Sequence, residues 1–112
     1  MNEDDFRRIA MSLPEAEEKS HFDRPDFRLR GKIFASIKNP RLAIINLNPE
    51  QQAAAIAAEP DMFSVVAGSW GKLGWTEVFL ADASDEPVYA AMLNAWKNLA
   101  PKVLIKASGM EG

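Results

Sequence analysis

The stretch FRLRGKIFASIKNPRLAIINL, residues 27–47, decides the fold. Phe27 and Leu29 alternate with arginines, and after Gly31 the apolar residues again recur at every second position, which is typical of half-buried strands. Glycine reaches positive φ at little cost, so Gly31 is expected to form the turn between two antiparallel strands, residues 27–30 and 32–38. Asn39 and Pro40 interrupt the pattern, and a third, more apolar strand is expected over residues 41–47.

Towards the N-terminus, an apolar stripe predicts an amphipathic helix over residues 3–12, and Pro14 ends it. The stripe has the spacing i, i+3, i+4 and i+7 and consists of Phe6, Ile9, Ala10 and Leu13. Glu15, Glu17 and Glu18 follow, and we interpret them as a solvated acidic turn. A catalytic pair or metal site would require their burial, for which the sequence gives no indication.

Towards the C-terminus, a second helix is expected to start at Asn48, with Pro49 and Gln51 at capping-box positions, and to stop at Pro60. Strands are expected over residues 62–66 and 75–80, joined by a glycine-rich loop over residues 68–74. A last helix would be capped by Ser84 or Asp85 and would end before Pro101, followed by a frayed tail after residue 102. Its apolar stripe consists of Val88, Met92, Ala95, Trp96 and Leu99.

The predicted fold class is therefore α+β, with two layers. The elements follow in the order helix, three strands, helix, two strands, helix, and the short connections favour an antiparallel sheet of about five strands. The first and last helices should pack on that sheet through their stripes. A chain of 112 residues with 47% hydrophobic and 26% charged residues is typical of a single globular domain, residues 1–112.

The residue inventory argues against several kinds of chemistry. The absence of cysteine excludes disulfides, thiolate metal sites and cysteine nucleophiles. His21 is the only histidine, and we interpret it as a surface or hydrogen-bonded residue, although Ser20, Asp23 or Asp26 could orient it as a base. The glycine-rich loop lacks the order of a phosphate-binding Walker motif. We therefore expect no metal, no organic cofactor and no catalytic activity.

The chain also lacks features of export. Three of its first five residues are acidic where a signal peptide is basic, and no apolar run reaches the length of about 18 residues that a membrane span needs. Together with the absence of cysteine, this predicts a cytoplasmic protein with no membrane partner.

Charge is the most informative feature for function. Residues 27–48 carry five basic and no acidic residues, a local charge of +5, which leaves −8 for the rest of a chain whose net charge is −3. Such a surface could follow a phosphate backbone. Equally, strand positions that face solvent often carry lysine or arginine to prevent edge pairing.

The candidate nucleic-acid contacts are the basic residues of these strands and one lysine of the glycine-rich loop: Arg28, Arg30, Lys32, Lys38, Arg41 and Lys72. Strand alternation predicts Lys32, Phe34 and Lys38 on one face, with Phe34 exposed. Trp70 and Trp75 either cover an edge of the core or, with Phe34, form an exposed aromatic set for a protein or small ligand.

Several short motifs in order along the chain resemble the MmcQ/YjbR family of small bacterial proteins. They are Leu13-Pro14-Glu15, His21-Phe22, the run from Arg30 to Ala35, Asn48-Pro49-Glu50-Gln51, Trp70-Gly71, Gly74-Trp75-Thr76, Ala95-Trp96 and Ala100-Pro101.

The resemblance implies a two-layer fold with an antiparallel sheet, and it transfers no catalytic residue. Members are commonly labelled DNA-binding because their shape resembles a double-wing arrangement, in which strands and loops approach DNA. The expected partner is thus DNA, bound modestly by a protein of net negative charge; the alternative is an interaction module for a protein or small ligand.

Overall fold

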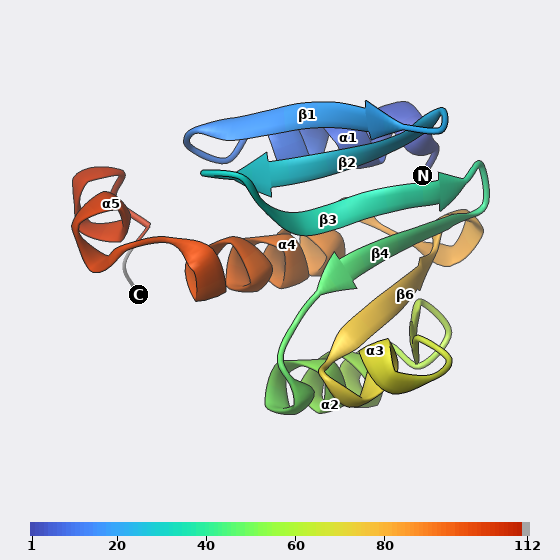
Figure 1. The fold of residues 1–112 in the computed structure, drawn as a ribbon. Helices are drawn as coiled ribbons and strands as arrows, with labels where there is room; N and C mark the ends of the chain where they lie inside the picture. Colours follow the sequence, from blue (N-terminus) through green and yellow to red (C-terminus); the bar gives the residue numbers. More distant parts are fainter. Residues whose placement is uncertain (111–112) are drawn as a thin grey trace.

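Within residues 1–110, which the computed structural model describes apart from the side chain of His21, six antiparallel strands form one sheet. Their order across the sheet is β1-β2-β3-β4-β6-β5 (Figure 1). The strands are β1 (Ala16–His21), β2 (Arg24–Leu29), β3 (Lys32–Asn39), β4 (Leu42–Asn46), β5 (Phe63–Val65) and β6 (Trp75–Phe79). The expected antiparallel α+β architecture is confirmed.

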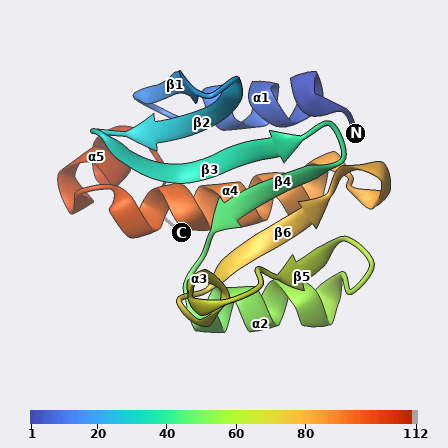
Figure 2. The ribbon, with the colours of Figure 1, turned by 45° about the vertical axis from the view of Figure 1, so that its right-hand side comes forward.

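Helices α1 (Glu3–Met11) and α4 (Asp85–Leu99) form the second layer against one side of the sheet. In both ribbon views they lie on the same side of the sheet (Figures 1 and 2). The remaining helices are α2 (Pro49–Ala58), α3 (Ser69–Lys72) and α5 (Lys102–Ala107), and a single 3-10 turn, η1 (Leu80–Asp82), leads from β6 towards α4.

The core lies between this helix layer and the sheet. Trp96 is fully buried at its centre, and its indole Nε1 donates a hydrogen bond of 2.9 Å to the carbonyl oxygen of Pro14. The rings of Phe6 and Phe27 join α1 to β2, with centroids 6.1 Å apart. The two predicted stripes are buried as expected, except that Leu99 is only partly buried.

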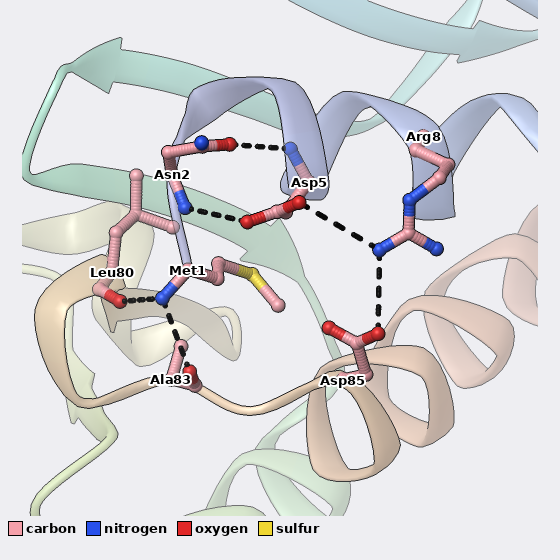
Figure 3. Close-up of polar contacts among 7 residues, drawn as sticks. All are labelled: Met1, Asn2, Asp5, Arg8, Leu80, Ala83 and Asp85. Atoms are coloured by element: carbon pink, nitrogen blue, oxygen red, sulfur yellow. Dashed lines mark hydrogen bonds and ion pairs between the residues drawn. The ribbon is translucent and has the colours of Figure 1, made fainter.

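Two of the three predicted helix starts have side-chain caps, whereas Ser84 is the N-cap of α4 as predicted but its side chain makes no capping hydrogen bond among the described residues. Asn48 and Gln51 form a reciprocal capping box on α2, with Oδ1 of Asn48 accepting from the Gln51 backbone at 2.9 Å. Asn2 and Asp5 form the same arrangement on α1 (Figure 3). These bonds satisfy backbone donors that a helix start otherwise leaves unpaired.

The start of the chain is attached to the segment before α4. The amino group of Met1 donates to the carbonyl oxygen of Leu80 at 2.9 Å, and Arg8 in α1 lies 3.3 Å from a carboxylate oxygen of Asp85 (Figure 3). These contacts fix the orientation of α1 relative to α4.

Three segments differ from the prediction. The acidic stretch expected to be a turn forms β1, an edge strand whose only partly buried residue before His21 is Ala16. Strand β1 is held by backbone hydrogen bonds to β2, so its sequence does not show the apolar alternation from which a strand is predicted. The glycine-rich loop contains the one-turn helix α3, and the tail forms α5, whose Leu104 is buried. Gly112 lies outside the described residues.

A bulge changes which side of β3 faces the core. The register shifts between Phe27 and Arg28, so that Phe27 lies opposite Ala35 while Arg28 lies opposite Ile33. The intervening Phe34 is the extra residue and is fully buried, whereas Ile33 is 37% exposed. The expectation of an exposed Phe34 is therefore wrong, because strict alternation fails where a strand carries one residue more than its partner.

Candidate nucleic-acid interface

The face of the sheet opposite α1 and α4, here called the open face, carries a row of polar and apolar side chains. Asp26 lies opposite Ser36, Ser36 opposite Ile44, and Ile44 opposite Glu77. Directly opposed residues of antiparallel strands point to the same side, so these residues share the open face. Glu77 makes the β6 side of this face unfavourable for phosphate and leaves β2, β3 and β4 as the better surface.

A hollow of about 250 Å³ lies on these strands. Ile33, Ser36 and Ile44 are among its lining residues, and Arg24 and Lys38 border it near the turns that follow β1 and β3. Trp75 borders the opposite end, since it pairs with the last residue of β4. The hollow thus has two cations at one end and an aromatic ring at the other.

Two of the predicted arginines are engaged in ion pairs. Arg28 donates from Nε and Nη2 to the two carboxylate oxygens of Asp26, at 2.8 and 3.1 Å. Arg30 donates to both oxygens of Glu15 at 3.1 and 3.3 Å. These hydrogen bonds raise the pKa of each guanidinium, and the bond from Arg30 lowers the pKa of Glu15. Neither arginine presents an uncompensated charge.

The other predicted cations are exposed and lie at different ends of the sheet. Lys38 and Arg41 flank the β3-β4 turn, whereas Lys32 starts β3 beside the β2-β3 turn and Lys72 lies in α3. Within the described part of the chain, none of these four has an ion-pair partner within 4.0 Å. The predicted basic set is therefore divided, and of its six residues only Lys38 lines the hollow.

Arg24 is a site residue that the sequence interpretation missed. It begins β2, is exposed, and lies beside Lys38 in the lining of the hollow. The segment that contains basic but no acidic residues begins at residue 27, after Asp23 and Asp26. Arg24 lies outside this segment and was therefore not counted with it. Because residues two apart on a strand point to the same side, the spacing of Arg24, Asp26 and Arg28 could have placed Arg24 on this face.

The two tryptophans form a stacked pair. The rings of Trp70 and Trp75 have centroids 4.3 Å apart and an angle of 20° between their planes. Trp75 is partly buried and Trp70 is 53% exposed, so only Trp70 of the pair presents a large area to solvent.

A buried glutamine holds this pair in place. Nε2 of Gln52 in α2 donates to the carbonyl oxygens of Gly71 at 3.0 Å and Trp75 at 2.9 Å. A Cβ atom at Gly71 would collide with the carbonyl oxygen of Val66, so α3 packs directly on the backbone before it. Both tryptophans are thus attached to well-packed backbone.

A second hollow, of about 400 Å³, is lined mainly by residues of α2 and α4. Alanine is its most frequent lining residue, including Ala54, Ala58 and Ala90, and Glu50 and Glu59 also line it. This volume is within the range of small-molecule sites.

The described residues contain no group of three or more histidine, aspartate or glutamate side chains that could hold a metal ion. The side chain of His21, the one imidazole considered as a base, lies outside the described part of the structure. No helix among the described residues is both long and apolar enough to cross a membrane.

Comparison with known proteins gives a family and a fold. A family model described as YjbR matches residues 11–98. Among solved structures, the chain is similar to the crystal structure of the Deinococcus radiodurans protein DR2400, a DUF419 domain, with 21% identity and a TM-score of 0.66 over 95% of this chain and 86% of that one. The comparison with curated proteins finds no match.

Proposed function

The chain belongs to the YjbR family, and from the surface that its fold presents we propose that it binds DNA through the open face of the sheet. The observation that carries this proposal is the hollow on β2, β3 and β4, with Arg24 and Lys38 at one end and Trp75 at the other. Unpaired cations are the groups that neutralise phosphates, and an aromatic ring offers a surface to a base.

The cations around the hollow suggest a small contact area. Arg24, Lys38 and Arg41 are exposed and flank the turns at the same end of the sheet. If each contacts one phosphate, the logarithm of the affinity should fall with the logarithm of salt concentration at a slope of about −2.7. Counting all five strand cations would give about −4.5, but Arg28 and Arg30 are held by carboxylates.

The net charge of −3 further supports modest affinity, because the molecule as a whole does not attract a polyanion at long range. We propose a binding role without catalysis for a protein of the cytoplasm, where DNA would be accessible to it. Lys32 and Lys72 would be secondary contacts, since they lie away from the cations that border the hollow.

A titration of labelled DNA by fluorescence anisotropy, repeated over a range of salt concentrations, tests the proposal. Lys38→Glu should weaken binding by reversing one charge at the hollow. Lys102→Glu is the matched control, because Lys102 is exposed in α5, outside the open face, and the net charge changes equally. Absence of binding at low salt, or an equal effect of the two variants, would contradict binding at this surface.

The hollow between α2 and α4 favours a second candidate, binding of a small apolar ligand. A thermal-shift screen of small molecules tests it, with Ala54→Trp as the variant that should fill the hollow. A ligand that stabilises the wild type and leaves the variant unaffected would support this role.

A further inference from the structure

Trp70 is the exposed member of the stacked tryptophan pair. It is 53% exposed, whereas its neighbour in the stack, Trp75, is partly buried and borders the hollow. Stacking at 4.3 Å uses one face of the Trp70 ring, so the exposed area belongs to the rest of the indole.

The backbone under this pair is fixed from two directions. The side-chain amide of Gln52 bonds to the backbone of Gly71 and Trp75, and the carbonyl oxygen of Val66 leaves no room for a side chain at Gly71. An exposed ring that is held in advance loses little conformational entropy when a partner stacks on it. The arrangement therefore suits the binding of a flat, apolar surface.

We infer that the open face prefers single-stranded over duplex nucleic acid, that Trp70 and Trp75 are a stacking platform for an unpaired base, and that Arg24 and Lys38, at the other end of the hollow, bind phosphates farther along the same strand. This inference rests on the proposed function and names its substrate class. In a duplex each base is covered on both faces by its neighbours, and exposing one requires unpairing or unstacking at a cost of a few kcal/mol. A single strand offers its bases without that cost.

The composition of the hollow fits this substrate. Its floor includes the apolar side chains of Ile33 and Ile44, while cations are restricted to one end. A duplex backbone would require cations along its whole path, and Glu77 on β6 faces that path. Stacking also tolerates any base, so we expect little sequence preference.

The test compares a labelled oligothymidylate of about 12 nucleotides, within the site sizes common for single-strand binders, with a duplex of the same length. The wild type should bind the single strand more tightly. Trp70→Ala should weaken single-strand binding by about 5–150-fold, Trp70→Phe should retain much of it, and duplex binding should change little in either variant. Leu73→Ala is the matched control, because Leu73 is equally exposed, at 58%, and follows α3 directly.

Tryptophan fluorescence supplies a second readout. Stacking of a base on the pair should quench the emission of the wild type, and most of this quenching should disappear in Trp70→Ala. Equal or tighter binding of the duplex, or unchanged single-strand affinity in a folded Trp70→Ala variant, would overturn the preference while leaving DNA binding intact. Failure of both nucleic acids to bind would instead refute the proposed function.

Discussion

Asp26 and Arg28, two residues apart on β2, form a bidentate ion pair on the open face of the sheet, with N-to-O distances of 2.8 and 3.1 Å. Residues two apart on a strand point to the same side, which brings the two side chains together. The Asp26 side chain is only 9% exposed, and its residue lines the hollow. The most central arginine of the predicted basic surface is therefore neutralised within its own strand.

Asp26→Asn should tighten nucleic-acid binding, because it removes the carboxylate that engages Arg28. One additional phosphate contact would make the slope of log affinity against log salt steeper by about 0.9 for duplex DNA and by about 0.7 for a single strand. Asp61→Asn is the control, since Asp61 is exposed in the turn between α2 and β5 and produces the same change in net charge. Salt-dependent anisotropy measurements that give both variants the same affinity would exclude Arg28 as a latent contact.

Gln52 provides a test of how the tryptophan pair is held. Gln52→Ala removes two hydrogen bonds and leaves the carbonyl oxygens of Gly71 and Trp75 without them, so we expect a loss of about 1–3 kcal/mol in the free energy of unfolding. Gln52→Met retains most of the side-chain volume and separates packing from hydrogen bonding. Urea denaturation should give similar losses for the two variants. A nearly stable methionine variant would show that packing, and not hydrogen bonding, is responsible.

The sequence predicted the elements that local patterns determine. The apolar stripes placed α1 and α4, and the Asn48 and Gln51 spacing placed the start of α2. Gly31 was expected at the turn between β2 and β3, where φ is +84°. Each of these features depends on residues that are close together in the chain, so it can be predicted from the sequence.

The features that escaped prediction depend on distant partners. Strand β1 is defined by its pairing with β2 and not by its own apolar pattern. The burial of Phe34 follows from a register shift against β2, and the neutralisation of Arg30 follows from Glu15, fifteen positions earlier. The candidate site was only partly predicted for the same reason: the sequence identified Lys38 but not Arg24, and it did not indicate the carboxylates that neutralise Arg28 and Arg30.

The pair of Glu15 and Arg30 should make stability depend on pH. The hydrogen bond from Arg30 lowers the folded-state pKa of Glu15 below its ordinary value of 4.5. The stabilisation is therefore present above that ordinary value and is lost as pH falls through the lowered pKa. The melting temperature of Glu15→Gln should be below that of the wild type near neutral pH, by a small amount because the pair is exposed, and the difference should vanish in acid.

Glu17→Gln is the comparison for this experiment, because the Glu17 carboxylate has no ion-pair partner within 4.0 Å among the described residues. Its melting temperature should stay close to that of the wild type across the same pH range. A difference between Glu15→Gln and the wild type that persists at low pH would show that the substitution acts through the backbone or packing and not through the ion pair.

Trp96 should be the side chain on which the fold depends most. It is fully buried in α4 and donates to the carbonyl oxygen of Pro14, so it joins the last long helix to the segment between α1 and β1. Trp96→Ala should lower the free energy of unfolding by about 3–5 kcal/mol, because it creates a cavity in the core. Trp96→Phe should cost less, although it still removes the hydrogen bond to Pro14.

Tyr89→Ala is the control, because Tyr89 lies in the same helix and is 38% exposed. In urea denaturation it should lower the free energy of unfolding much less than either Trp96 variant. Similar losses for Trp96→Ala and Tyr89→Ala would contradict the central place of this indole in the core.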